Sequence, residues 1–431
     1  MIKLSAITSQ FELSPTLAAN ELAQARRKRG LDVLHMGFGE SPFPVPARLN
    51  KALQDNAGLK QYLPTAGLPE LQEAVAKYYR ENTDLDTDAY DVIVAPGSKL
   101  ILYALQMAVE GDLLMPVPSW VSYAPQAHML HTGIVKVPTT LNDEGYHICP
   151  QALKNTITQA REAGQNPSKI ILNYPNNPTG LTFTEDNLKE IAEVCVAEDV
   201  LIISDEIYGF VNFTGEPYRS IAKYAPTHTA ITTGLSKHLS LGGWRVGVGF
   251  IPKAVSGLHK MLCTIASETW SCVPAPIQQA SVEAYKNHKD IEEHIAACSA
   301  VHEHMNCYIG KKLRQSGISV PQPQGAFYSY PNFDEQRSAL NKLGVTTSTE
   351  LAAYLGEHYG LIALPGAAFG EDANSLTLRL SGCDYDGTTA LKAYQDGTTL
   401  DDTFVKTYAP RVVEALAAFD NFSQKIKQAA A

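Results

Sequence analysis

The sequence predicts an α/β protein in which helices cover a mostly parallel, seven-stranded sheet. Short apolar runs alternate with helical patterns through the middle of the chain, which is typical of that fold class. The chain has 431 residues, 45% of them hydrophobic and 19% charged, so its composition is ordinary for a globular protein with a sizeable core. Its length suggests two or three domains, and no internal repeat or low-complexity linker divides it.

Seven apolar runs are the expected strands. They cover residues 91–95, 113–115, 133–137, 169–173, 200–204, 229–232 and 246–251. Two of the helices between them are marked by their ends, because residues 69–81 have a proline at the start and residues 184–198 begin at Thr184, a suitable N-cap. We therefore expect one large α/β domain over residues 46–285.

The pattern changes after residue 285. A long helix over 289–315 is followed by short strands over 326–330, 361–364 and 375–380, which indicates a smaller α+β domain. Residues 1–45, with a helix over 15–29, and residues 286–431 are expected to form it together. Its end is an extended helical region, with helices over 384–395 and 401–427 to which the sequence assigns no function.

Composition argues against several functional classes. The net charge of −10 disfavours nucleic acid, which requires a basic face. The seven cysteines include no Cys-x-x-Cys pair, so we expect neither a disulfide framework nor a metal site. No run of eighteen apolar residues occurs and the first residues lack a signal pattern, so we expect a cytoplasmic protein with no membrane partner.

Polar residues follow four of the strands, at the sheet edge where open α/β sheets bind ligands. The four segments are 96–99, 174–180, 205–208 and 234–245. The first, Pro-Gly-Ser-Lys, opens a helix and could bind an anion, although a plain helix cap by Ser98 is an equal alternative. In the last, a lysine lies among Gly, Leu and Ser residues. If it is desolvated near a cation such as Arg245, its free amine could attack a carbonyl group.

The run Gly-Leu-Ser-Lys237-His-Leu-Ser-Leu-Gly-Gly-Trp-Arg245-Val-Gly resembles the pyridoxal-phosphate attachment signature of class I/II aminotransferases. The other three segments occur in the family's order and spacing, and the resemblance extends from about residue 15 to 382. It implies a fold type I enzyme that moves the amino group of an L-amino acid to a 2-oxo acid by a ping-pong mechanism with a pyridoxamine intermediate. A lyase or synthase on the same scaffold is the alternative.

The resemblance also implies which residues surround the cofactor ring. Lys237 would form the Schiff base and then move the proton at the substrate's alpha carbon. Asp205 would pair with the pyridine nitrogen, while Tyr208 and Asn177 would bind the ring's phenolic oxygen. Trp120 would stack on the ring.

The phosphate would be bound by Ser98, Lys99 and Arg245, and by Tyr62 from a second subunit. A homodimer with shared active sites is therefore expected. This sequence departs from the family at Gly234, where many relatives have a phosphate-binding serine. Thr233 and Ser236 are the two candidates to replace it.

For the substrate, the resemblance implies that Arg379 binds the alpha-carboxylate, with Gly39 and Asn177 beside it. Lys99 falls where some bacterial aspartate aminotransferases bind the distal carboxylate, which would favour a dicarboxylic substrate. The alternative is an aromatic amino acid in a pocket lined by Phe38, Trp270 and Tyr328.

Overall fold

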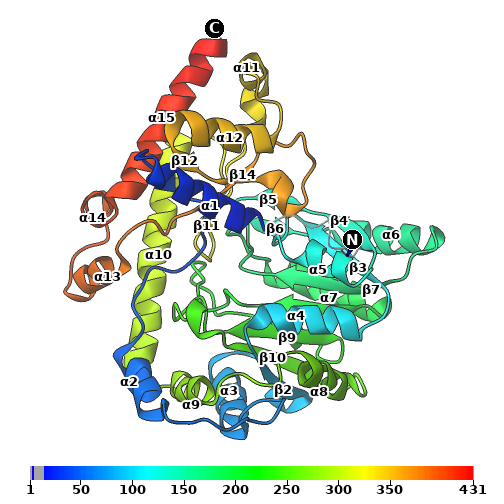
Figure 1. Cartoon of the computed structure of the whole chain (residues 1–431). Coiled ribbons are helices and arrows are strands. Elements are labelled where there is room, and N and C mark those ends of the chain that lie inside the picture. Colours follow the sequence, from blue (N-terminus) through cyan, green and yellow to red (C-terminus); the bar gives the residue numbers. More distant parts are fainter. Residues whose placement is uncertain (1, 4–13, 431) are drawn as a thin grey trace.

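A computed structural model describes residues 2–3 and 14–430 of the chain. Most of the first residues, on which the expected absence of a targeting signal depends, lie outside this part. The centre of the molecule is a seven-stranded sheet (Figure 1). Its strands, in spatial order, are β2 (Tyr90–Ala95), β10 (Gly247–Pro252), β9 (Thr229–Gly234), β8 (Leu201–Asp205), β7 (Pro167–Asn173), β3 (Asp112–Val117) and β4 (Ile134–Pro138). Only β10 is antiparallel to its neighbours, so the predicted fold class is confirmed.

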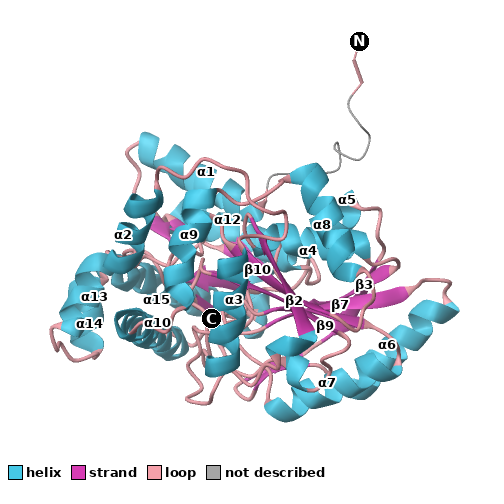
Figure 2. Cartoon of the chain, turned by 90° about the horizontal axis from the view of Figure 1, so that it is seen from below, coloured by secondary structure: helices cyan, strands magenta, loops and turns pink. Residues whose placement is uncertain are grey.

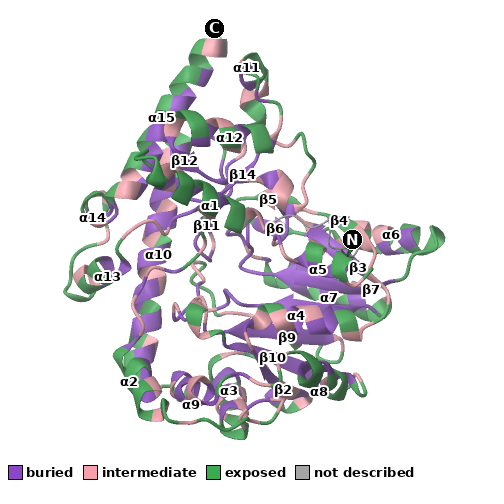
Figure 3. Ribbon diagram, in the orientation of Figure 1, coloured by how far each residue is buried: buried purple, intermediate pink, exposed green. Residues whose placement is uncertain are grey.

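Helices cover both faces of the sheet, as Figure 2 shows. One face is covered by α4 (Ser98–Ala108), α5 (Tyr123–Met129) and α8 (Leu258–Thr269). The other face is covered by α3 (Pro69–Asn82), α6 (Pro150–Glu162), α7 (Glu185–Ala197) and α9 (Ala275–Val282). Successive residues of a strand point to opposite faces, so Ile171 of β7 packs on the α4 face, while Ile170 and Leu172 pack on the other. Burial on both faces explains the nearly continuous apolar runs of the strands, and Figure 3 shows the sheet buried beneath helices with exposed outer faces.

The ends of two helices agree with the sequence. The Thr184 hydroxyl oxygen accepts a hydrogen bond from the Asn187 amide at 3.2 Å, which makes Thr184 the N-cap of α7. Helix α3 starts at Pro69, where a missing amide hydrogen costs nothing.

The second part of the structure lies beyond α10 (Lys289–Gln315), which runs along one side of the molecule in Figure 1. Its core joins Leu34, Met36 and Phe43 from the start of the chain to residues from 297 onward. The expected domain boundaries at 45/46 and 285/286 stay a prediction. The other helices there are α1 (Pro15–Lys28), α11 (Arg337–Lys342), α12 (Ser348–Tyr359) and α13 (Gly387–Gln395). Helix α2 (Ala47–Asn56) packs instead against α9, with Leu49 in the core beneath the sheet.

The strands outside the main sheet are short. The expected strand over 326–330 is reduced to β11 (Tyr328–Ser329), and the one over 361–364 is divided into β12 (Leu361–Ile362) and β13 (Leu364–Pro365). The last expected strand forms as β14 (Leu378–Ser381). The structure adds β1 (Leu34–His35), which pairs with β12, and the hairpin of β5 (Thr140–Asn142) and β6 (Gly145–His147).

The expectation of one helix over 401–427 is wrong. The segment forms two helices, α14 (Asp402–Tyr408) and α15 (Pro410–Ala430). Proline has no amide hydrogen and disfavours helical geometry in the residue before it, so Ala409 ends the first helix. Phe419 and Phe422 of α15 are buried in the same core as α10. Over the described residues, no helix has the length and apolar character needed to cross a membrane.

Strand pairing determines where the polar segments meet. The register places Asn173 beside Asp205 and Asp205 beside Thr232, at the carboxyl ends of β7, β8 and β9. Because β10 is antiparallel to β9, residues 235–246 connect the two strands as a loop at this same edge. That loop carries Lys237.

Candidate active site

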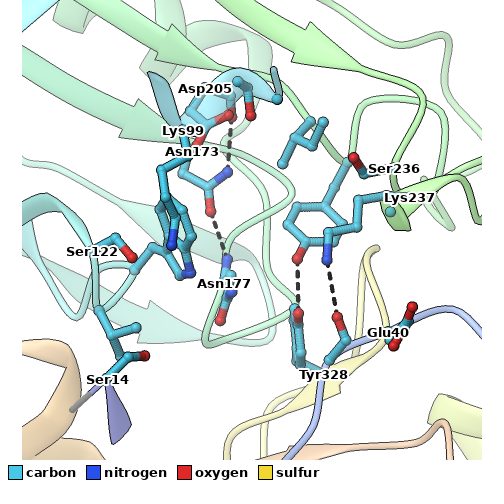
Figure 4. Close-up of a pocket in the computed structure, with 18 of the residues that line it drawn as sticks. Ser14, Glu40, Lys99, Ser122, Asn173, Asn177, Asp205, Ser236, Lys237 and Tyr328 are labelled. Carbon is cyan, nitrogen blue, oxygen red and sulfur yellow. Dashed lines mark hydrogen bonds between the residues drawn. The ribbon is translucent and has the colours of Figure 1, made fainter. Parts of the chain in front are cut away.

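A cavity of about 430 Å³ lies at this edge of the sheet (Figure 4). It brings together segments that are far apart in the sequence, from the loop after β1 to β14. Of the eleven residues that the family resemblance assigns to binding the cofactor or the substrate's alpha-carboxylate, ten line it: Gly39, Ser98, Lys99, Trp120, Asn177, Asp205, Tyr208, Lys237, Arg245 and Arg379. The eleventh, Tyr62, is not among the lining residues and is 90% exposed.

Lys237 lies half-buried in the cavity wall. Its Nζ atom donates a hydrogen bond to the carbonyl oxygen of Gly39 at 2.9 Å. Burial, with a smaller contribution from Arg379, lowers the pKa of Lys237 to about 8, against the opposing effects of Cys383, Glu40 and Asp205. The sequence had suggested Arg245 as the cation responsible. That suggestion is wrong, because the cation beside Lys237 comes from β14.

Gly39 must be a glycine for a steric reason. A Cβ atom at this position would lie 2.1 Å from the hydroxyl oxygen of Tyr328. The close approach keeps the Gly39 carbonyl within reach of Lys237. The same Tyr328 hydroxyl lies 2.8 Å from that of Tyr208, within hydrogen-bond distance.

Asp205 is a buried carboxylate, 3% exposed, at the end of β8. It accepts hydrogen bonds from the Tyr123 hydroxyl at 2.6 Å and the Thr232 hydroxyl at 3.2 Å. Burial raises the pKa of Asp205 to about 6 despite these donors. Within the described part of the chain no cationic group forms a hydrogen bond or ion pair with it, so the cavity presents a carboxylate that a cationic ligand would stabilise.

Two asparagines connect this acid to the next loop. The Asn173 side chain donates to the Asp205 carbonyl oxygen at 2.8 Å and accepts from the Asn177 amide at 2.7 Å (Figure 4). Sequence reasoning missed Asn173 and Tyr123. Asn173 could have been found as the last residue of an expected strand, and Tyr123 lies in the Pro-Ser-Trp-Val-Ser-Tyr segment that drew attention to Trp120.

The start of α4 offers backbone amides to the cavity. Gly97, with a positive φ of 88°, occupies the N-cap position and Ser98 is the first helical residue, so the alternative of a cap by Ser98 is wrong. Arg245 approaches so closely that a Cβ on Gly97 would lie 2.2 Å from its Nη2 atom. Among the described residues Arg245 has no carboxylate partner. Free helix-start amides beside such a guanidinium favour an anion.

The structure also separates the two candidates for the missing serine. Ser236 lines the cavity, whereas the buried Thr233 hydroxyl lies 2.7 Å from that of Tyr79 on the other side of the strand. A Cβ on Gly234 would lie 2.4 Å from the carbonyl oxygen of Val246. Any side chain at position 234 would therefore require the neighbouring strand to move.

Arg379 is a buried guanidinium, 2% exposed. Its Nη1 atom donates to the Asn177 side-chain oxygen at 3.3 Å, and Nη2 donates to the Gly37 carbonyl oxygen. Its Nε atom has no partner, and no carboxylate of the described residues pairs with it. A buried cation held only by neutral groups, in a cavity wall, is suited to bind a carboxylate.

The remaining wall is both cationic and aromatic. The Nζ atom of Lys99 lies 4.9 Å from the Trp120 ring centre, and burial lowers the pKa of this lysine, with a further contribution from Arg245. Phe38 and Tyr328 line the cavity as expected, whereas Trp270 does not. Over the residues that the structure describes, no group of three or more His, Cys, Asp or Glu side chains could hold a metal ion.

Comparisons with known proteins agree with this site. The family model for class I and II aminotransferases matches residues 32–389. The aspartate aminotransferase of Geobacillus stearothermophilus is 34% identical over 381 residues, covering 86% of this chain and 93% of that protein. The asparagine–oxo-acid transaminase of Streptococcus mutans is 32% identical over 386 residues, covering 87% and 94% respectively. A structure of the aspartate aminotransferase of Thermus thermophilus with maleate, 26% identical, superposes with a TM-score of 0.82 and covers 98% of this chain and 100% of that one. This chain therefore belongs to the class I and II aminotransferases and is a pyridoxal-phosphate-dependent transaminase.

Proposed function

We propose that the cavity is the active site and that its preferred donor is a dicarboxylic L-amino acid such as aspartate or glutamate. Three charged groups that have no oppositely charged partner among the described residues support the placement of the cofactor and substrate. Asp205 would hold the ring nitrogen, Arg245 the phosphate, and Arg379 the substrate's alpha-carboxylate. The cofactor ring would also be contacted by Asn177, Tyr208 and Trp120. The phosphate would also be contacted by Ser98, Lys99 and Ser236.

The chain's own residues would do the proton work. When bound, the cofactor is an electron sink that stabilises negative charge at the substrate's alpha carbon. Lys237 would carry the cofactor and then move a proton at that carbon through its Nζ atom. A lysine with a pKa of about 8 has an appreciable free-amine fraction near neutral pH, which is what a base requires. Arg379 would orient the substrate so that the alpha carbon faces this amine.

Lys99 is the observation that supports a dicarboxylic substrate. Its Nζ atom lines the cavity and, among the described residues, forms no hydrogen bond or ion pair. A second substrate carboxylate would supply the missing anion. The relatives named for aspartate and asparagine, and the neighbour solved with maleate, agree with a short polar substrate. Because Phe38 and Tyr328 also line the cavity, an aromatic amino acid is the alternative substrate that the experiment must test.

The test is a panel of amino acids, each added alone to the loaded enzyme. Conversion of the cofactor to its amine form is measured spectroscopically, and Lys237→Ala is the control. Aspartate and glutamate should react fastest in the wild type, and Lys99→Met should lower their kcat/KM by about tenfold or more while changing that of phenylalanine less. A preference for phenylalanine that Lys99→Met leaves unchanged would refute the substrate assignment, and release of ammonia would indicate a lyase.

We further propose a homodimer in which Tyr62 completes the partner's active site. This large aromatic side chain is 90% exposed and lies outside the cavity of its own chain, which supports a role in a second subunit. Mixing Tyr62→Ala with Lys237→Ala protein tests it, because each mixed dimer would contain one intact site. Activity should recover to about a quarter of the wild-type level, and no recovery in verified mixed dimers would refute the sharing. A cytoplasmic location stays a prediction.

A further inference from the structure

Next to Asp205 lies a second buried acid, Glu206, that the proposed mechanism does not use. It is 3% exposed and four hydroxyl groups surround its carboxyl group. Oε1 accepts hydrogen bonds from Ser220 at 2.6 Å, Ser204 at 2.7 Å and Tyr174 at 3.0 Å. Oε2 accepts one from Tyr218. With three donors directed at Oε1 and one at Oε2, Oε2 is the oxygen with a lone pair left to carry a proton.

The hydroxyl groups around Glu206 are neutral. Among the described residues, no Lys, Arg or His forms a hydrogen bond or ion pair with Glu206, which faces away from the cavity because it follows Asp205 at the end of a strand. Burial, with a smaller contribution from the Asp205 carboxylate, raises the pKa of Glu206 to about 7 despite the hydroxyl donors, which lower it. The other titratable groups that face it are tyrosines: Tyr174 after β7, Tyr218 in the following loop, Tyr79 of α3 and Tyr90 of β2.

Two of the hydroxyl donors, Ser204 and Tyr174, come from segments that build the active site, and the other two, Tyr218 and Ser220, come from the loop that follows. Tyr174 precedes the Asn177 turn, and its hydroxyl also accepts a hydrogen bond from the Ile221 amide at 2.8 Å. Tyr218 reaches the carboxyl group across Gly209, where a Cβ atom would lie 2.7 Å from the tyrosine ring. Glu206 therefore joins three loops at one point behind the cavity.

We propose that Glu206 is a positioning residue for the active site, holding the loops of Asp205, Asn177 and Tyr208 in place and setting the electrostatic potential at Asp205 through its own proton. The second role rests on the proposed contact between Asp205 and the cofactor's ring nitrogen. When Glu206 loses its proton, a second negative charge lies beside Asp205. This second charge would make Asp205 and the ring nitrogen of the bound cofactor hold the proton between them more tightly.

The first experiment needs no cofactor. Melting temperatures of the apoprotein are measured from about pH 5 to about pH 8 for the wild type and Glu206→Gln, which stays neutral. An acid whose pKa is raised on folding stabilises the folded state less as pH rises from its unfolded value to its folded one. The wild type should therefore lose stability relative to Glu206→Gln across this window. The exposed Glu216→Gln is the matched control and should follow the wild type.

The second experiment uses the loaded enzyme and the absorption of its bound cofactor. The wild type should show a spectral transition with a midpoint near pH 7 that Glu206→Gln lacks, and Glu206→Ala should weaken cofactor binding by about tenfold. Ser220→Ala removes one donor and should move the midpoint to higher pH, which keeps a test available if the position 206 variants do not fold.

The outcomes separate this inference from the site assignment. Parallel melting curves and identical spectral profiles for the wild type and Glu206→Gln would overturn the role of its proton. Asp205→Asn is the control for the site, because it should change the cofactor spectrum at every pH. If Asp205→Asn leaves the spectrum unchanged, the proposed contact of Asp205 fails, while the apoprotein melting curves still test Glu206.

Discussion

Replacing Arg379 with alanine tests the substrate-binding assignment most directly. The guanidinium is 2% exposed and lacks an anionic partner among the described residues, so a bound carboxylate would be its first counter-charge in a site shielded from water. Removing one partner of such a desolvated pair costs about 3–5 kcal/mol, which corresponds to about two to four decades in kcat/KM. Because the cavity also loses two hydrogen bonds, to Asn177 and Gly37, the upper half of that range is expected.

The assay is steady-state transamination with aspartate, together with cofactor binding to confirm that the variant is loaded. Arg379→Lys keeps the charge but loses the two-pronged donor, so it should fall between the wild type and Arg379→Ala. Arg161→Ala, which removes a surface pair with Glu198 far from the cavity, is the matched control and should behave as the wild type. A loss of less than tenfold in a correctly loaded Arg379→Ala enzyme would refute the assignment.

Three further predictions concern the same cavity. Tyr123→Phe removes the 2.6 Å hydrogen bond to Asp205 and should raise the pKa of that acid. The dissociation constant of the cofactor, measured by fluorescence titration, should therefore rise about fivefold to tenfold. An unchanged dissociation constant would contradict the role of Tyr123. Gly39→Ala places a methyl group 2.1 Å from the Tyr328 hydroxyl oxygen. The value of kcat/KM should fall at least about tenfold, while the circular dichroism spectrum stays that of the wild type. Wild-type kinetics would show that the loop after β1 can shift to accommodate the methyl group. In the apoprotein, the extent of amine labelling of Lys237, measured by mass spectrometry, should rise with pH around a midpoint near 8, because burial favours the neutral amine. A midpoint near 10.5 would show that the lysine is solvated.

Much of the fold could be predicted because the signals are local. A strand buried on both faces is recognised by its own apolar run, as in Ile170 to Leu172, and the N-cap at Thr184 by its own hydroxyl. Two predictions about helix ends were wrong, and both concern local signals. Proline at position 410 marks a helix break that the apolar pattern alone concealed, and Gly97 rather than Ser98 caps α4.

The site divides in the same way. Lys237, Asp205 and Asn177 follow expected strands in short segments with distinctive residues, so their meeting at one sheet edge could be foreseen. Asn173 and Tyr123 lie in segments that could be picked out, but their role could not, because an asparagine and a tyrosine become important only when the fold places them against Asp205. Trp270 was expected near the substrate but packs elsewhere, since a helix end carries no sign of which face it turns to the cavity.

The sequence by itself determined the chemistry of this protein, because the cofactor's attachment and its main contacts depend on side chains whose identity and spacing can be read along the chain. The tertiary structure decided the energetics. It made Arg379 rather than Arg245 the cation that lowers the pKa of Lys237, selected Ser236 over Thr233 at the cavity, and surrounded Glu206 with hydroxyl groups and, over the described residues, no cation. Burial and the distances between remote segments set these properties, and neither is encoded in any one stretch of sequence.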